Sequence, residues 1–330
     1  MANKYNIGIF GGSGYVGSAI ADHLRKFYNV KIFDIKKPIA IQGVEFQIGD
    51  IRNQSEVMEF SQDLDVAITT AIIQIPLINE QKKLGYEVNF IGTQNVCQAV
   101  FSNERTKGLI GAGTWHTIGE RNLTGIINEE FGFRPDMVEE RAKLYALSKI
   151  AQESILRYYS SMSSKVFGVI RMGTVLGEGM PEKTAANIFI DRGLKGFSIT
   201  PYKQSMYRPM LYVDIADICR AYQVYVEKIL SAPIGNSSSL STIINVYHPE
   251  PITIIDLAKI VQEQIASKTN GTVNPKIDVV DSGQPMMFNE NDKTNIRVDI
   301  SKAKQFLGWN NLISPRESLA TIIDGRLKGQ

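Results

Sequence analysis

The stretch KLYALSK, residues 143–149, places a tyrosine and a lysine four positions apart in a segment with a helical pattern. Positions i and i+4 share one face of a helix, so Tyr145 and Lys149 can point at one ligand. A phenol with a lowered pKa can take a proton from a hydroxyl group, and a neighbouring ammonium favours the phenolate. The same spacing also occurs on solvated helix faces, so the surrounding elements decide between a reactive centre and an ordinary surface.

A glycine cluster, GGSGYVG at 11–17, lies among alternating strand and helix signals. A β-rich run at 5–10 precedes the cluster and a helical pattern at 18–27 follows it. Further strands are expected at 30–34 and 44–50. This order predicts a βαβ unit, and therefore a parallel sheet.

The cluster has the spacing of a dinucleotide-binding loop, with Gly11 or Gly12 followed by Gly14 and Gly17. A side chain at these positions would block the tight turn or the approach of a pyrophosphate, and the following helix presents its positive end to the phosphates. Asp34 ends the next expected strand, where a carboxylate accepts the ribose hydroxyls of NAD and repels the extra phosphate of NADP. The pattern therefore predicts NAD as the cofactor.

The rest of the chain continues the alternation. Strands are expected at 65–71, 108–114 and 165–171, and helices at 87–101, 138–162 and 252–265. We predict an α/β fold, a Rossmann-type doubly wound parallel sheet with a smaller mixed α/β substrate-binding domain. The expected NAD-binding domain comprises residues 1–174 with 209–246, and the expected substrate-binding domain comprises 175–208 with 247–330.

Composition limits the function classes. The net charge of +2 offers no concentrated basic surface for nucleic acid. Three scattered histidines and two distant cysteines, Cys97 and Cys219, indicate no metal site and suit buried thiols in a reducing compartment. The sequence shows no signal peptide and no apolar run of membrane-spanning length, so we expect a cytoplasmic protein without a membrane partner.

Motifs along the whole chain resemble those of the extended short-chain dehydrogenase/reductases, in the branch of NAD-dependent nucleotide-sugar epimerases and dehydratases. The matching segments are GGSGYVG (11–17), GDIRN (49–53), YEVNFIGTQNV (86–96), YALSK (145–149), RMGTVLG (171–177), YRPMLYVDIAD (207–217) and DISKAKQFLGW (299–309). The resemblance implies an enzyme with NAD as cofactor.

The resemblance also implies a set of cofactor contacts from the glycine loop, the ends of several strands and two helices. These residues are Gly11, Gly14, Tyr15, Val16, Gly17, Asp34, Asp50, Ile51, Thr70, Ala71, Asn89, Tyr145 and Lys149. In the catalytic roles, Tyr145 takes the proton from a substrate hydroxyl, Lys149 favours the phenolate and holds the nicotinamide ribose, and Thr114 hydrogen-bonds the reacting oxygen.

The residues after Thr114 bear on the type of reaction. Related dehydratases and decarboxylases carry a carboxylate there, whereas this chain has Trp115 and His116. An epimerase needs no such acid, so we expect a nucleotide-sugar epimerase that oxidises a carbinol and returns the hydride to the opposite face. A dehydrogenase or reductase of another hydroxyl or ketone compound, a dehydratase, and a non-catalytic NAD sensor stay as alternatives. The sequence leaves two roles open for His116, which are a second acid/base and a packed structural histidine.

The residues expected to bind the substrate match the family pattern less completely than the cofactor residues do. The resemblance implies that Thr174 and Arg208 contact the substrate, with the guanidinium on the phosphates of a nucleotide. Thr174 stands where the family usually has asparagine, and the segment 281–299 lacks the usual second phosphate contact. We expect a homodimer formed through the helices that hold Asn89 and Tyr145.

Overall fold

The computed structural model describes residues 5–38, 41–233 and 238–329. The contacts divide the chain into two compact units. Unit 1 comprises Met1–Ile118, Phe133–Arg171 and Ile218–Asn245, and unit 2 comprises Gly119–Gly132, Met172–Asp217 and Val246–Gln330. Compared with the boundaries expected from the sequence, unit 2 also takes residues 119–132, 172–174, 209–217 and 246. The binding roles of the two units stay predictions.

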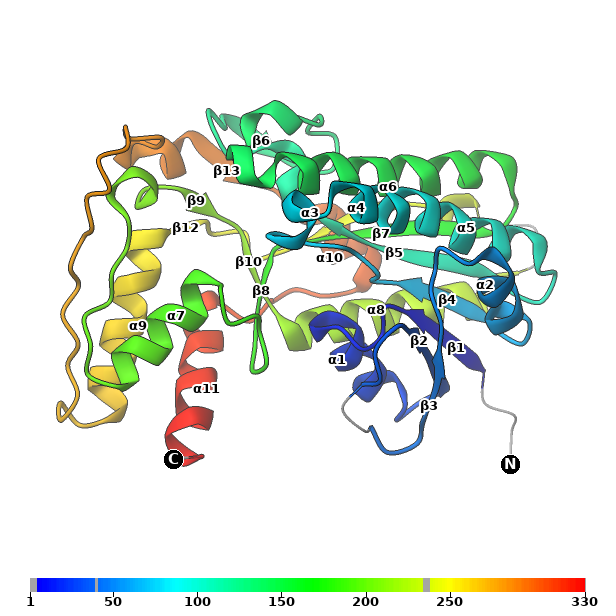
Figure 1. Ribbon diagram of the computed structural model, residues 1–330, viewed down its shortest axis with the longest axis horizontal. Coiled ribbons are helices and arrows are strands. Elements are labelled where there is room, and N and C mark those ends of the chain that lie inside the picture. Colours follow the sequence, from blue (N-terminus) through cyan, green and yellow to red (C-terminus); the bar gives the residue numbers. More distant parts are fainter. Residues whose placement is uncertain (1–4, 39–40, 234–237, 330) are drawn as a thin grey trace. The chain divides into compact units, whose positions relative to one another are not determined.

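Unit 1 is built on a seven-stranded sheet in the order β11-β7-β5-β4-β1-β2-β3 (Figure 1). The strands are β1 (Asn6–Phe10), β2 (Asn29–Asp34), β3 (Val44–Ile48), β4 (Val66–Thr69), β5 (Gly108–Thr114), β7 (Val166–Met172) and β11 (Ile243–Val246). The pairings from β3 through β2, β1 and β4 to β5 are parallel. The chain places β2 and β3 on one side of β1 and the later strands on the other, which confirms the doubly wound Rossmann-type fold.

Helices cover both faces of this sheet. They are α1 (Tyr15–Leu24), α2 (Gln54–Ser61), α3 (Leu77–Glu80), α4 (Lys82–Tyr86), α5 (Thr93–Ser102), α6 (Lys143–Met162) and α8 (Ile215–Ser231). Figure 1 shows α5 and α6 along one face and α1 and α8 along the other. Phe10 is at the centre of the core between sheet and helices, with its ring 5.5 Å from Phe33 and 5.0 Å from Phe60. Both cysteines, Cys97 and Cys219, are buried and neither belongs to a disulfide.

Two of the expected helices differ from the structure. The helix expected at 138–162 begins only at Lys143, because Val138 has extended backbone and packs its side chain against Ala142 and Ala146. The helix expected at 87–101 is formed, but its first part, Glu87–Gly92, is a π-turn, η1, which continues directly into α5. Wider turns of this kind are common at functional sites.

Unit 2 combines helices with short two-stranded sheets, which confirms the expected mixed α/β architecture. Its helices are α7 (Ala185–Leu194), α9 (Ile254–Lys268), α10 (Ser301–Leu307) and α11 (Pro315–Lys328). Its strand pairs are β8 (Thr174–Leu176) with β10 (Tyr212–Asp214), β9 (Pro209–Met210) with β12 (Ile252–Thr253), and β6 (Gly125–Ile127) with β13 (Ile296–Val298).

Close packing and capping stabilise the helices of unit 2. α7 approaches α9 at Gly193, where a Cβ atom would lie 2.5 Å from Ile265 Cδ1. Thr253 and Asp256 form a capping box at the start of α9 and satisfy backbone donors that the helix itself leaves unpaired. In the part of the chain that the structure describes, no helix has both the length and the apolar character needed to cross a bilayer.

Candidate active site

The three expected catalytic residues meet where β5 ends against the first two turns of α6. Thr114 is the last residue of β5, and its side chain lowers the pKa of the Tyr145 phenol by hydrogen bonding. Lys149 lies one turn further along α6 and donates a 2.8 Å hydrogen bond from Nζ to the carbonyl of Ala112, on the same strand. The strand end therefore fixes the Lys149 side chain.

Burial governs the electrostatics of this group. Burial raises the pKa of Tyr145 above its ordinary value, and the hydrogen bond with Thr114 lowers it in part. Burial also lowers the pKa of Lys149 to about 7. Desolvation disfavours the charged form of each side chain. The role expected of Lys149 toward the phenolate stays a prediction.

We expect Lys149 to make the free energy of unfolding rise with pH. Folded Lys149 loses its proton near pH 7, whereas an unfolded lysine keeps it until about pH 10.4. The unfolded chain therefore binds more protons across this window, and linkage then stabilises the folded state as the pH rises. Relative to Lys149→Met, the wild type should gain roughly 2–3 kcal/mol between pH 7 and pH 9 in urea unfolding. Parallel pH profiles of the two proteins would contradict this assignment.

The glycine loop has the shape that a pyrophosphate requires. Gly11 has φ +76°, and a Cβ on it would lie 2.5 Å from the backbone N of Ala71. A Cβ on Gly17 would lie 2.5 Å from the carbonyl O of Gly11, so both glycines allow close backbone packing. Gly14 meets nothing closer than 3.4 Å, which leaves the space over its backbone open. The residues here fit the phosphates of a dinucleotide.

The start of α1 supports this fit. Gly14 is its N-cap and provides no side-chain cap, so Tyr15, Val16 and Gly17 form a first turn whose backbone donors point out of the helix end. A helix N-terminus of this kind favours negative charge.

Asp34 and Thr70 hold the loop in place. The carboxylate of Asp34 accepts hydrogen bonds from the backbone N of Ser13 at 3.0 Å and of Lys36 at 3.1 Å. Thr70 donates from its hydroxyl to the carbonyl of Gly11 at 2.9 Å. The acidic residue expected at the ribose is thus tied to the glycine loop, at the carboxyl ends of β2 and β4.

Other expected cofactor residues have clear structural partners. Asp50 binds Arg52 at 2.6 Å, and this hydrogen bond lowers the pKa of Asp50. Ile51 is buried, and Gly92 is small enough to pack directly on it. Direct contacts of these residues with the cofactor stay predictions.

Asn89 connects two parts of the site. Its amide accepts from the backbone N of Ile73 at 2.7 Å, and donates to the carbonyl of Ile73 and to Ser148 Oγ at 3.1 Å each. These bonds use both amide hydrogens and one lone pair of the oxygen. Asn89 therefore clamps the loop after β4 to α6, and a direct contact with NAD stays a prediction.

A row of buried polar residues on α6 was not predicted from the sequence. Ser148, Gln152 and Glu153 follow Tyr145 at the spacing of one helix face, and all three are buried. Gln152 donates to Thr93 Oγ1 at 2.9 Å, and Glu153 forms an ion pair with Arg171 at 2.7 Å. The run of polar residues three and four positions apart was the available signal.

The two expected substrate residues belong to unit 2. Thr174 begins β8, and its backbone N donates to the carbonyl of Leu211 at 2.7 Å. The side chain of Arg208 is only 12% exposed and lies 3.7 Å from the carboxylate of Glu120. Glu120 is itself buried, so this guanidinium is partly neutralised inside the unit.

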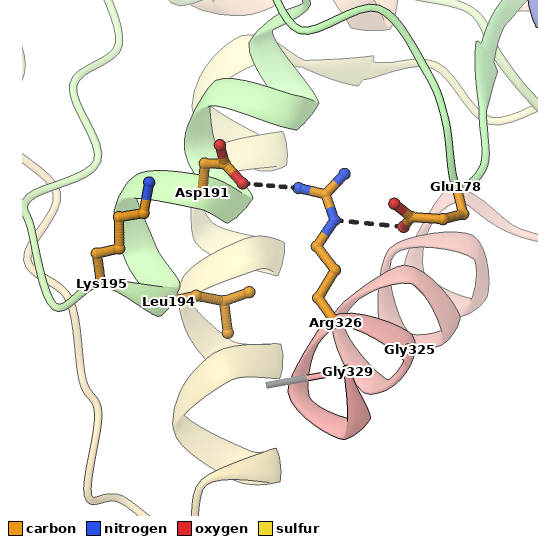
Figure 2. Close-up of a pocket in the computed structure, with 7 residues that line it drawn as sticks. All are labelled: Glu178, Asp191, Leu194, Lys195, Gly325, Arg326 and Gly329. Carbon is orange, nitrogen blue, oxygen red and sulfur yellow. Dashed lines mark hydrogen bonds and ion pairs between the residues drawn. The ribbon is translucent and has the colours of Figure 1, made fainter.

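Unit 2 also contains a hollow of about 460 Å³ between α7 and α11. Figure 2 shows Arg326 reaching between two carboxylates, with Asp191 at 3.0 Å and Glu178 at 3.3 Å. The lining also includes Lys195, so two cations balance two carboxylates and the hollow carries no excess positive charge for an anion.

The fold and the site together define a class, the Rossmann-type enzymes that pair a dinucleotide loop with a Thr–Tyr–Lys centre. The family model described as "NAD dependent epimerase/dehydratase family" matches residues 7–239, more than half of the chain. The protein belongs to this family, and NAD is its cofactor.

Curated relatives from two branches are similar to the chain. Mouse (Mus musculus) sterol-4-alpha-carboxylate 3-dehydrogenase, decarboxylating, is 33% identical over 91 residues, which are 27% of this chain and 25% of that protein. Zebrafish (Danio rerio) UDP-glucuronic acid decarboxylase 1 is 24% identical over 328 residues, which are 96% of this chain and 71% of that protein. The similarity thus spans only a quarter of the sterol dehydrogenase.

Solved structures share the fold over nearly the whole chain. MoeE5 in complex with UDP-glucuronic acid and NAD has a TM-score of 0.79 at 17% identity, covering 98% of this chain and 100% of that one. UDP-glucose 4-epimerase of Thermotoga maritima with UDP-glucose has a TM-score of 0.77 at 20% identity, covering 98% and 99%. At sequence identities this low, the similarity establishes a shared fold only.

Proposed function

We propose that the protein is an NAD-dependent nucleotide-sugar epimerase. The observation that carries the proposal is the group of Thr114, Tyr145 and Lys149 at the end of β5, followed by an aromatic pair, Trp115 and His116, rather than by a carboxylate. Family membership, the fold shared with UDP-sugar enzymes and the decarboxylase similarity support a nucleotide-sugar substrate.

The chain's own residues would handle the proton in this reaction. NAD, when bound, supplies the hydride acceptor and donor and a positive ring beside the phenol. Tyr145 accepts the proton of the sugar hydroxyl and returns it to the same oxygen after the ketone has turned its other face. Thr114 holds that oxygen and Tyr145 in one hydrogen-bonded group. Lys149, oriented by Ala112, would hold the nicotinamide ribose.

The cofactor and substrate assignments follow the same residues. We propose that Gly11, Gly14 and Gly17 bind the pyrophosphate and that Asp34 binds the adenine ribose, since the loop and the acid are hydrogen-bonded together. We assign Arg208 to the substrate phosphates because a guanidinium can bind them in bidentate fashion.

A specific observation favours a second candidate, a dehydrogenase of another hydroxyl compound. Arg208 already faces Glu120. Lys293, a cation in the segment 281–299 that lacks the usual second phosphate contact, forms an ion pair with Asp256 at 2.7 Å. Both cations are therefore engaged within the protein. The similarity to a sterol dehydrogenase also favours the dehydrogenase candidate.

One experiment separates the candidates. The purified protein is incubated with a panel of nucleotide sugars, while absorbance at 340 nm and sugar composition are followed together. New stereoisomers without accumulating NADH establish the epimerase, whereas stoichiometric NADH establishes a dehydrogenase. No turnover across the panel by NAD-loaded protein rejects the nucleotide-sugar assignment.

We also propose that the protein is a homodimer through the η1–α5 segment and α6. Exposed apolar residues on these helices support the proposal, namely Ile91, Phe101, Leu147, Tyr158 and Met162. Sedimentation of the purified protein tests it, and a monomer at micromolar concentration would reject it.

A further inference from the structure

The segment after β3 is held in place by the two helices beside it. The backbone N of Asp50 donates to the carboxylate of Glu56, on α2, at 2.9 Å. Asn95, on α5, donates to the carbonyls of Ile51 and Arg52 at 2.9 Å and 3.1 Å. Because the backbone of this segment is anchored on both sides, the direction of the Asp50 carboxylate is decided by its side-chain contacts.

Arg52 makes those contacts. Its Nε atom lies 3.1 Å from Asp50 Oδ1 and 2.9 Å from Oδ2, its Nη2 atom lies 2.6 Å from Oδ2, and its backbone N donates to Oδ1 at 2.9 Å. A guanidinium is planar and its donors have a fixed geometry, so this contact sets both the position and the plane of the carboxylate. The side-chain hydrogen bond also lowers the pKa of Asp50 and keeps the carboxylate ionised at neutral pH.

Glu87, the first residue of η1, holds the other side of the same guanidinium. Arg52 Nη1 donates to Glu87 Oε2 at 3.0 Å, so one planar group joins two carboxylates. The side chains of Arg52, Asp50 and Glu87 are 40%, 29% and 34% exposed, and ion pairs with this much exposure contribute little to stability. The direction that the arrangement gives to Asp50 is therefore its more important effect.

The order of the strands places this carboxylate beside the adenine of NAD. The glycine loop follows β1, Asp34 ends β2 and Asp50 follows β3, and these three strands are neighbours in the sheet. The backbone N of Gly49 donates to the carbonyl of Asp34 at 3.0 Å, so the ends of β2 and β3 lie side by side. In NAD the pyrophosphate, the adenine ribose and the adenine follow one another in the same order.

The Asp50 carboxylate has room for one more donor. An ionised carboxylate offers about four acceptor positions and has no proton to donate. In the described part of the chain, three N–H groups donate to it, namely the backbone N–H, the Nε–H and an Nη2–H of Arg52. The remaining position suits an amino group and disfavours a carbonyl oxygen. The amino group of adenine is a donor of this kind.

We propose that Arg52 is a positioning residue that makes the enzyme selective for adenine over a purine with a carbonyl oxygen in place of the amino group. Glu87 holds the guanidinium, the guanidinium holds the Asp50 carboxylate, and the carboxylate accepts a hydrogen bond from the adenine amino group. This inference rests on the proposed binding of the adenine ribose by Asp34. It concerns the cofactor alone and is independent of the substrate.

The test compares NAD with nicotinamide hypoxanthine dinucleotide, in which a carbonyl oxygen replaces the adenine amino group. Isothermal titration calorimetry of the cofactor-free full chain gives the dissociation constant of each. We expect the wild type to bind NAD about tenfold more tightly, because the analogue loses a hydrogen bond to a charged group. In Arg52→Met the ratio of the two constants should fall to near one, since the carboxylate loses its fixed direction. Arg52→Lys should keep part of the ratio.

Glu87 and Lys83 provide the matched variants. Glu87→Met should lower the ratio by less than Arg52→Met does, and it should have no further effect when Arg52 is already methionine, because Glu87 acts through that side chain. Lys83 lies 3.7 Å from the other oxygen of the Glu87 carboxylate and is 90% exposed. Lys83→Met should therefore keep the wild-type ratio.

Three results would overturn the proposal. The first is a wild-type ratio near one, and the second is an equal loss of affinity for both dinucleotides in Arg52→Met, which would give Arg52 a structural role only. The third is tighter NAD binding by Arg52→Met, which would mean that Arg52 competes with the adenine. Asp34→Ala should weaken both dinucleotides equally. If it weakens neither, the ribose assignment is rejected, while a ratio that depends on Arg52 still supports the selectivity.

Discussion

Tyr145→Phe should abolish most turnover while NAD still binds. The change removes only the hydroxyl that Thr114 contacts, so the ring and its packing against His116 are kept. That oxygen is the proposed acceptor of the substrate proton, and the change removes it. General-base catalysis contributes about 10²–10⁴-fold, and we expect kcat to fall by that factor.

The measurement compares kcat and the NAD dissociation constant on the substrate that the sugar panel identifies. Tyr158→Phe is the matched control, because Tyr158 lies on the same helix and is 71% exposed. Its turnover should equal that of the wild type. Full activity of Tyr145→Phe would show that this residue takes no part in the reaction. The Tyr-x-x-x-Lys pair would then be an ordinary feature of a helix face.

Arg171→Met should be the more damaging of two substitutions that each remove one partner of Glu153. The Arg171 and Glu153 side chains are 2% and 1% exposed and lie 2.7 Å apart, with a second hydrogen bond at 2.8 Å. Without Arg171 the buried Glu153 carboxylate keeps only the half-exposed Arg157, and removing one member of a buried pair costs about 3–5 kcal/mol. Arg157 binds the same carboxylate at 2.8 Å but is 50% exposed, so Arg157→Met should cost about 1 kcal/mol or less.

Urea unfolding of both variants at pH 7 gives the comparison. The double variant Glu153→Gln with Arg171→Met adds a control, because it removes both charges and should recover much of the lost stability. Equal losses for Arg157→Met and Arg171→Met would show that burial does not govern this pair. A double variant no better than Arg171→Met would assign the loss to packing, including the contact of Arg171 with the ring of Phe133 at 5.3 Å.

The sequence predicted features that depend on neighbours along the chain. The parallel strands, the glycine loop before α1 and the Tyr145–Lys149 spacing are local patterns of period and turn chemistry, and the structure forms all of them. Thr114 was expected at the end of a parallel strand, where ligands gather, and the structure places it as the last residue of β5.

What the sequence did not predict depends on contacts between distant segments. Residues Glu139–Ala142 are good helix formers, yet α6 starts later because Val138 packs in an apolar cluster with Ile75. The contact of His116 with Thr114 depends on a 3-10 turn, which the periodicity of the sequence does not predict. The charge state of Lys149 depends on burial, which is a property of the folded chain.

The π-turn at Glu87–Gly92 makes chain length, and not only residue identity, a requirement of the site. A π-turn contains one residue more than an α-helical turn, so deleting one residue there would rewind it and rotate Asn89 by about 100° relative to α5. The amide would then leave Ile73 and Ser148, and the loop after β4 would lose its link to α6. Variants of this enzyme should therefore tolerate substitutions in this segment, apart from Glu87, Asn89 and Gly92, far better than deletions.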